Sequence, residues 1–395
     1  MAASLGRSLR SRSRGWRSSL LLCAMAAFTV GATGCGQSAG PTSSSSGSSA
    51  GVLEAKQLVA TEEKMLDTWP APGPAFDASK ARGKLIWYIS GDLSSEFEHQ
   101  LTQGMSEAAQ AVGARFTAID GKGQAAEYAR AVDEGVAQHA NVIVLGGVQP
   151  QVVAPQLADA KKAGIPVIAG HEADPGVTVP NEDPSVVAYA AHCIGCAGKM
   201  VGDFLVADSN GKVNAVVFSV SAFGPFIAGE VKGIQDEVNR LCQGCKIKIV
   251  DVSLPQLNNV GDLASSLLRQ DPTINYLVPA YDQLALFMIP AVHALGRQGS
   301  VKIVSTNAAP GVLKFMADHD VVVGDVGDPT VWQGWGFGDQ AIRVVSGTTP
   351  VSDIKAPLRM IDTSNIASID LKADPTTWYW SGDFRAAYKQ LWGVK

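Results

Sequence analysis

Two pairs of cysteines have the spacing at which thiols form a redox centre, a metal site or a local disulfide. They are Cys193 with Cys196 and Cys242 with Cys245. A redox-active pair needs a helix amino-terminus to stabilise its thiolate, and Cys193 does precede a helical pattern. Four thiolates could instead hold zinc. Outside the cytoplasm such cysteines usually form disulfides, which is the interpretation we favour, with two local bridges among the three possible pairings.

The remaining residue types that do chemistry show no catalytic spacing. The six histidines include no pair four residues apart that could bind a metal from one helix face; they are at positions 99, 139, 171, 192, 293 and 319. The nucleophile-elbow, phosphate-loop and zincin motifs are also absent from the sequence. We therefore expect no catalytic residue, no metal and no cofactor.

The first 34 residues have the pattern of a secretory signal. Arg7, Arg10, Arg12, Arg14 and Arg17 precede an apolar stretch over 19–32, which is shorter than the about 20 residues that a membrane span needs. Small residues then lead to Cys35, as in a bacterial lipobox, and this resemblance implies that Cys35 becomes lipidated. The alternative is a secreted protein that is cleaved elsewhere. Residues 35–51 are rich in serine and predict a flexible tether.

Composition excludes some classes of partner. The 395 residues are 46% hydrophobic, which is enough for two or three domains with their own cores. Lys and Arg number 32 and Asp and Glu 37, so the net charge is −5, and removal of residues 1–34 leaves 27 bases against 37 acids. An acidic chain without a basic stripe is a poor partner for nucleic acid or an anionic lipid surface. We expect contact with a membrane only through the lipid anchor.

Strands and helices alternate through the rest of the chain, after a short helix over 52–68. Apolar runs predict two series of strands, over 84–90, 114–119, 141–146 and 165–170, and over 213–220, 246–252, 274–279, 301–305 and 321–326. Helical spacing separates them, as over 226–241 and 283–295. This pattern predicts an α/β fold with two doubly wound parallel-sheet domains. Such sheets bind ligands at the carboxyl ends of their strands, so two facing domains form a cleft.

Several segments between Lys84 and Pro350 resemble the periplasmic-binding-protein type I family, in its ribose/galactose-like sugar-binding branch. They are Ser94–Phe97, Ala163–Ile168, Asp282–Ala285, Val301–Asn307 and Asp328–Thr330. The resemblance implies three hinge crossings, near 187–192, 326–328 and 355–363. It implies an N-terminal lobe of residues 84–191 and 328–354 and a C-terminal lobe of 192–327 and 355–395, after an N-terminal extension of 52–83. The glycines from Gly334 to Gly338 then indicate close backbone packing at the hinge.

The family pattern, carried over position by position, implies a set of ligand-binding residues at the cleft. They are Phe97, Glu98, Gln149, His171, Glu172, Glu230, Tyr281, Asp282 and Asn307. Phe97 retains the family's aromatic residue, whereas most of the other positions differ from the family pattern. The carboxylates accept hydrogen bonds from hydroxyl or ammonium groups, and no arginine occupies an aligned position. We therefore expect a neutral polyhydroxylated ligand, with a cationic ligand as the alternative, and no carboxylate or phosphate ligand.

The resemblance implies a monomeric, extracytoplasmic solute-binding protein that the lipid on Cys35 anchors to the cell membrane. It would capture a small ligand, a sugar or sugar-like polyol, by hinge closure and deliver it to the permease of an ABC importer. A sensory binding protein that presents its closed form to a membrane receptor is one alternative. An enzyme that uses a Cys-x-x-Cys pair is another, and it would show reactive thiols.

Overall fold

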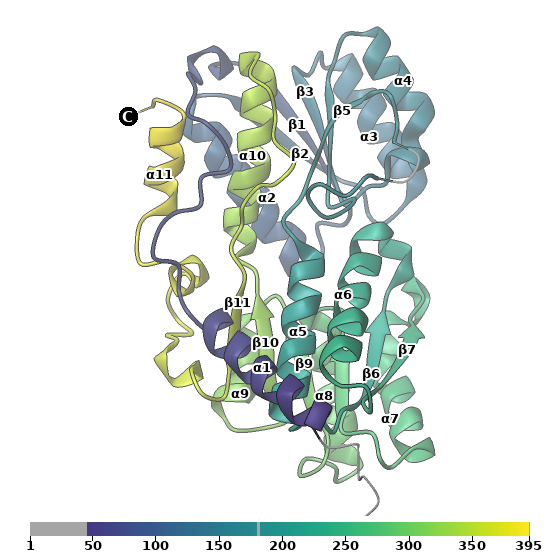
Figure 1. The fold of residues 1–395 in the computed structure, drawn as a ribbon. Coiled ribbons are helices and arrows are strands. Elements are labelled where there is room, and N and C mark those ends of the chain that lie inside the picture. The colour runs from purple at the N-terminus through teal and green to yellow at the C-terminus, as the bar shows by residue number, and fades with distance from the viewer. Residues whose placement is uncertain (1–45, 180–181, 395) are drawn as a thin grey trace, which may run out of the picture. The chain divides into compact units, whose positions relative to one another are not determined.

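Two β-sheets organise the described part of the chain, residues 46–179 and 182–394 of a computed structural model (Figure 1). The first sheet defines the N-lobe, has the order β2-β1-β3-β4-β5 and is entirely parallel. Its strands are β1 (Leu85–Ser90), β2 (Arg115–Asp120), β3 (Val142–Gly146), β4 (Val167–Gly170) and β5 (Val186–Ala190). The helices of this lobe are α2 (Glu96–Ala111), α3 (Ala125–Ala137), α4 (Ala154–Lys162) and α10 (Thr330–Ser346). Every residue of β1 is buried, because helices cover both faces of the sheet.

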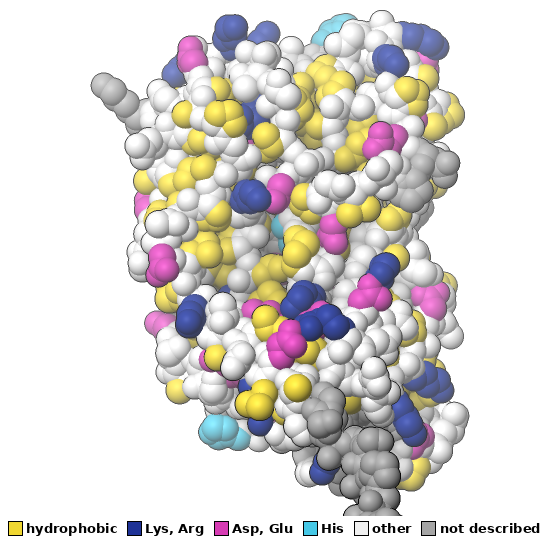
Figure 2. Space-filling model, viewed as in Figure 1, with side chains coloured by type: hydrophobic (Ala, Val, Ile, Leu, Met, Phe, Trp, Pro, Cys, Tyr) yellow, Lys and Arg dark blue, Asp and Glu magenta, His cyan; other side chains and the backbone are white. Residues whose placement is uncertain are grey.

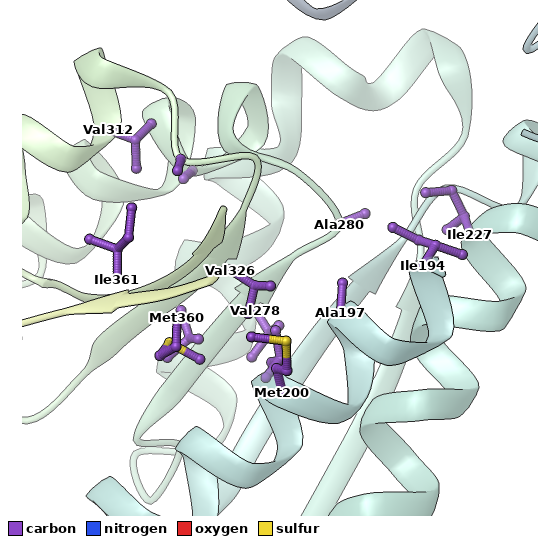
Figure 3. Packing of buried hydrophobic residues seen from close by; sticks show 14 of the residues in the cluster. Ile194, Ala197, Met200, Ile227, Val278, Ala280, Val312, Val326, Met360 and Ile361 are labelled. Atoms are coloured by element: carbon purple, nitrogen blue, oxygen red, sulfur yellow. The ribbon is translucent and has the colours of Figure 1, made fainter. Parts of the chain in front are cut away.

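The second sheet defines the C-lobe and has the order β11-β10-β9-β8-β6-β7. Its strands are β6 (Asn214–Ser219), β7 (Lys246–Asp251), β8 (Tyr276–Pro279), β9 (Lys302–Thr306), β10 (Val322–Gly327) and β11 (Arg359–Asp362), of which β11 is antiparallel to β10. The helices are α5 (Ile194–Asp208), α6 (Pro225–Leu241), α7 (Val260–Gln270), α8 (Asp282–Ala294) and α9 (Pro310–Ala317). Figure 3 shows how Met200 of α5 lies beside Val278 of β8 and Val326 of β10 in the core of this lobe.

The structure confirms the predicted α/β class with two sheets. All nine predicted strands are present within two residues of their predicted limits. Strands β5 and β11 were not predicted, and both lie at the edge of a sheet. In β5 the side chains are mostly half-buried, and in β11 two apolar residues lie between Arg359 and Asp362, so neither has the continuous apolar run of a central strand.

Helix α1 (Ser46–Glu62) packs along α5 and α6 of the C-lobe. The prediction of a tether over 35–51 is therefore wrong for residues 46–51, and the predicted helix begins and ends earlier than 52–68. A Cβ atom on Gly51 would lie 1.9 Å from the carbonyl oxygen of Leu241, so the two backbones are in direct contact. Glu54 pairs with Arg240 at 2.7 Å. The N-terminal extension thus starts as part of the C-lobe.

The C-terminal tail leaves the C-lobe, although we predicted that all of 355–395 belongs to it. Strand β11 pairs with β10, but helix α11 (Phe384–Leu391) packs on α10 of the N-lobe. Phe384 stacks on Trp332 with ring centroids 4.6 Å apart, and Trp392 stacks on Trp335 at 5.4 Å. The aromatic residues of the tail predict a buried face, but their spacing does not show which helix that face covers.

The extension and the tail both run between the lobes in addition to the hinge segments. The N–H groups of Phe76 and Ala78 donate to the carbonyl oxygens of Leu391 and Trp392, at 2.9 and 3.1 Å. The extension therefore passes from α1 on the C-lobe to α11 beside the N-lobe. The hinge segments between elements of the two lobes are 191–193, 328–329 and 347–358. Of the described helices, none has both the length and the apolar composition of a membrane span.

Helices α2 and α10 approach each other at glycines. A Cβ atom on Gly104 would lie 2.2 Å from the carbonyl oxygen of Val331, and one on Gly334 would lie 2.3 Å from that of Leu101. Gly334 thus permits close backbone packing, as its sequence context indicated, but its partner is α2 rather than the hinge.

Gly104→Ala should lower the free energy of unfolding by about 1–3 kcal/mol, because the added methyl group forces these helices apart. Chemical denaturation measures the change. Gly311→Ala in α9 is the matched control, since no described atom lies within 4 Å of the added Cβ and alanine favours helix over glycine. The control should be neutral or slightly stabilising, and equal losses in the two variants would contradict the account.

Candidate functional site

The carboxyl ends of strands in both sheets lead into residues that touch between the lobes. His171 follows β4 of the N-lobe, and its ring centroid lies 4.8 Å from that of Phe226 in the first turn of α6, which follows β6 of the C-lobe. Asp174 of the N-lobe accepts the N–H of Gly195 in α5, with both carboxylate oxygens at 3.0 Å. These contacts bring the two lobes together at the predicted cleft.

A group of aromatic rings surrounds His171. Its ring centroid lies 5.7 Å from those of both Phe97 and His192, and 4.7 Å from that of Phe337. Phe226 lies against both histidines, 5.5 Å from His192. Phe97 and His171 were predicted for this site, whereas Phe226, His192 and Phe337 were not. The group offers aromatic faces of the kind that cover the apolar side of a sugar ring or attract a cation.

Both histidines of this group are neutral near pH 7. Burial lowers the pKa of His171 to about 4 and that of His192 to about 3. Nε2 of His171 lies 3.2 Å from Oε1 of Gln333, and Nε2 of His192 lies 3.5 Å from a carboxylate oxygen of Asp328. The histidines can therefore donate and accept hydrogen bonds, but they bring no positive charge to the site.

Two carboxyl groups of the N-lobe lie at the same edge of its sheet. Glu98, in the first turn of α2, accepts hydrogen bonds from the hydroxyl groups of Tyr88 at 2.9 Å and Ser90 at 2.7 Å. Burial raises its pKa to about 7 in spite of these donors. Glu172 follows β4 directly after His171, is 4% exposed, and burial raises its pKa to about 7 as well. Glu172 thus lies close to a strand end, and Glu98 lies in the helix that follows β1.

Two more buried carboxyl groups come from the C-lobe and the hinge. Glu230 lies one helical turn after Phe226 in α6, and Asp328 follows β10 where the chain crosses between the lobes. Thr306 donates to Oε1 of Glu230 at 3.3 Å, while Oε2 has no partner among the described atoms. Asn307 donates to Asp328 at 3.2 Å. Burial, with each acid close to another, raises the pKa of Glu230 well above its usual range and that of Asp328 to about 7.

The remaining predicted residues lie at the border of this site. Asp282 accepts the N–H of Ala309 at 2.6 Å and is 3% exposed, so its carboxylate supports the turn after β9 that carries Asn307. Tyr281 packs on Phe223, with centroids 6.0 Å apart. Gln149 lies against the backbone of α6, because a Cβ atom on Gly224 would lie 2.3 Å from its Nε2.

Sequence reasoning missed several residues of the site, and a local signal in the sequence exists for two of them. Phe226 opens a predicted helix directly after a predicted strand, which is the position where cleft residues are expected. Asp328 belongs to a segment that carried the family resemblance, but we gave it no role. His192 and Gln333 enter the site from the first hinge crossing and from α10, and their sequence contexts give no such signal.

The four cysteines of the folded body form two local pairs. Cys193 bonds Cys196 with an S–S distance of 1.95 Å, and Cys242 bonds Cys245 at 2.07 Å. The first pair lies at the amino end of α5, beside the Gly195 N–H that Asp174 accepts. Among the described residues, no cluster of three or more His, Cys, Asp or Glu side chains has a metal-binding arrangement. Cys35 lies outside the described residues.

Glu98→Gln should change how stability depends on pH. The folded chain holds a proton on Glu98 up to about pH 7, but the unfolded chain releases it near 4.5. The wild type should therefore lose stability relative to the variant as the pH rises from about 5 to 8. Gln keeps an acceptor for Tyr88 and Ser90, and thermal unfolding at several pH values measures the difference. A difference that does not vary with pH would contradict the proposed burial.

Charged side chains of both signs lie on the face of the molecule in Figure 2. On the described part of the face in Figure 2, acidic and basic side chains are interspersed, and no continuous basic area covers it. Apolar side chains lie between the charged ones near the middle of this face. A mixed face of this kind differs from the continuous basic area that attracts a phosphate backbone.

Comparisons with known proteins agree with this arrangement. Residues 86–349 match the family model described as "Periplasmic binding protein domain". A D-ribose/D-allose-binding protein of Pseudomonas aeruginosa is 25% identical over 240 residues, which are 55% of this chain and 71% of that relative.

Solved structures share the fold at lower sequence identity. An ABC transporter solute-binding protein from Agrobacterium vitis, with bound allitol, aligns with a TM-score of 0.63 and 21% identity over 73% of this chain and 98% of its own. One from Bacillus halodurans C-125, with bound myo-inositol, gives a TM-score of 0.61 and 18% identity over 73% and 97%. These relatives are binding proteins rather than enzymes.

Proposed function

The chain belongs to the periplasmic binding protein family, and we propose that it captures a small sugar or sugar-like polyol between its lobes by hinge closure. The observation that carries this proposal is the direct contact of His171 with Phe226, which come from opposite lobes and from strand carboxyl ends. A ligand that touches both lobes stabilises the closed state, and it shifts the equilibrium only by its higher affinity for that state. The allitol, the myo-inositol and the ribose or allose of the relatives support a polyhydroxylated ligand.

A thermal-shift titration of the purified protein tests this proposal. The probes are ribose, allose, allitol and myo-inositol, together with their aminated and acidic analogues. A ligand at 100 times its Kd should stabilise the folded chain by about 2.7 kcal/mol. Concentration-dependent stabilisation by at least one polyhydroxylated probe is the expected result. Stabilisation by none of them would contradict the proposal.

The proposed localisation is extracytoplasmic, with lipid on Cys35 as the membrane anchor. Support comes from the sequence, in which the arginines, the apolar stretch and the small residues before Cys35 follow one another in the order of a lipoprotein signal. Cys35→Ser should move most of the protein from the membrane fraction to the soluble fraction of a bacterial host. Cys23→Ser is the matched control, since Cys23 belongs to the segment that is removed. Retention of the Cys35→Ser protein in the membrane fraction would contradict lipid anchoring.

The proposed partner is the permease of an ABC importer, to which the closed form delivers its ligand. The support is the naming of the solved relatives as ABC transporter solute-binding proteins. Deletion of the gene should abolish uptake of the radiolabelled ligand at concentrations near its Kd. Uptake that persists while a transcriptional response to the ligand is lost would favour the sensory alternative.

A further inference from the structure

Four carboxyl groups at the cleft lack a cationic partner. Glu98 and Glu172 come from the N-lobe, Glu230 from the C-lobe and Asp328 from the hinge, and the last three are 4%, 1% and 3% exposed. No Lys or Arg of the described residues forms an ion pair or a hydrogen bond with any of them. The groups that influence their pKa values are hydroxyl groups, amides and other acids. The N-lobe, the C-lobe and the hinge therefore each contribute at least one acid without a cationic partner.

Two buried acids elsewhere in the fold have a cationic partner. In the N-lobe, Asp339 is fully buried and pairs with the equally buried Arg343 at 2.8 Å. In the C-lobe, the fully buried Asp203 pairs with Lys199 at 2.6 Å. Asp325, beside the cleft, has no cation but accepts the N–H of Ala308 at 2.9 Å. Burying an ionised acid without a partner is costly, so these acids hold their protons to higher pH in the free protein, and a cation from outside the chain would stabilise their ionised form.

The buried hydrogen-bonding groups at the site include both acceptors and donors. Oε2 of Glu230 is buried without a partner among the described atoms, and so are both ring nitrogens of His192. In the neutral ring, only one of these nitrogens carries a proton. Nε2 of Gln333 is a buried donor close to Asp328, and Nδ2 of Asn307 is bonded to Asp328. A ligand that donates to Oε2 of Glu230 and also offers an acceptor to Nε2 of Gln333 therefore fits this site.

Aromatic faces lie next to these acids. Phe226 and Glu230 are four residues apart in α6 and so lie on one face of the helix. Phe226 also contacts His171 and His192. An ammonium group near Glu230 could thus interact with an aromatic face as well as with a carboxylate.

We propose that the ligand is a polyol that carries a protonated amine, with its ammonium group held between Glu230 and Asp328 and beside Phe226. This inference rests on the proposed function, and it specifies the charge of the ligand. Three ammonium N–H groups would satisfy the orphaned oxygen of Glu230 and oxygens of Asp328, and the positive charge would compensate both acids. The hydroxyl groups would bond Glu98, Glu172 and Gln333.

Matched ligands that differ at one functional group, which is neutral, cationic or anionic, test the inference. Calorimetric titration of the full-length protein would compare glucose with glucosamine and glucuronate, and sorbitol with 1-amino-1-deoxysorbitol. We expect at least one amine to bind at least about 10-fold more tightly than its neutral partner. Glucuronate should have the lowest affinity of the set. Neutral members that bind as tightly as their amines would overturn the inference and leave the proposed function intact. Binding of no member, neutral or aminated, would overturn both.

Substitution of Glu230 tests where the ammonium group of the ligand binds. Glu230→Gln keeps the size of the side chain and should reduce the preference for the amine to less than about 3-fold. Glu96→Gln is the matched control, because Glu96 is an exposed acid of α2 whose side chain bonds Gln100, and it should leave the preference unchanged. An unchanged preference in a folded Glu230→Gln protein would contradict the placement of the ammonium group. Circular dichroism establishes folding of both variants.

Discussion

Asp339→Ala should lower the free energy of unfolding by about 3–5 kcal/mol, because it leaves the charge of Arg343 buried without its partner. Both side chains are fully buried, and Asp339 also accepts the indole N–H of Trp392 at 2.7 Å. Arg343 in turn donates to the carbonyl oxygen of Pro74 at 3.2 Å. The substitution therefore removes one bond to the C-terminal tail and the partner of the arginine that bonds the N-terminal extension. Chemical denaturation of the purified variant measures the loss.

Asp318→Ala is the matched control for this prediction. Asp318 also pairs with a basic residue four positions away in the chain, Lys314, but both side chains are more than half exposed. Exposed pairs of this kind contribute about 0.3–0.5 kcal/mol. A loss of similar size in the two variants would show that the ion pair of α10 does not hold the two terminal segments.

Phe97→Ala and Phe226→Ala should each weaken ligand binding by about 2 kcal/mol, or about 30-fold, as expected for aromatic residues at the centre of an interface. Phe97 belongs to the N-lobe and Phe226 to the C-lobe, and both contact His171. Neither is fully buried, so the loss of stability should be smaller than for a core phenylalanine. Titration of the polyol that gives the largest thermal shift measures the effect.

Leu286→Ala provides the comparison for these two variants. Leu286 is an apolar residue of α8 in the C-lobe that is 43% exposed, and its loss should change the affinity by less than about 3-fold. A large effect of Phe97→Ala together with no effect of Phe226→Ala would mean that one lobe binds the ligand alone. That outcome would contradict closure of both lobes on the ligand.

The central strands could be predicted because every residue in them is buried and therefore has to be apolar or small. Helices cover both faces of each sheet, so β1 and β3 consist of fully buried residues that read as apolar runs. Edge strands do not need a continuous run of apolar residues. Strand β11 is held by one neighbour and ends in charged residues, which is why it escaped prediction.

The position of His171 and Glu172 after a strand could be predicted from the sequence, whereas the binding roles of these residues and of Glu98 stay predictions from the family resemblance. Contacts that depend on how the lobes meet could not be predicted in this way. His192 and Gln333 reach the site from positions 141 residues apart in the sequence, and no spacing connects them. The tail shows the same limit, because Trp332 and Phe384 stack although neither sequence context specifies the other.

The distance between the lobes is the most direct test of the account. Val177 of the N-lobe and Leu254 of the C-lobe are 59% and 44% exposed, so cysteines introduced there can carry labels while the native pairs remain bonded. Pulsed dipolar spectroscopy would compare the free protein with the protein saturated by the best-binding polyol. We predict a longer and broader distance distribution in the free protein and a shorter, narrow one in the complex. The same distribution before and after saturation would contradict ligand capture by hinge closure.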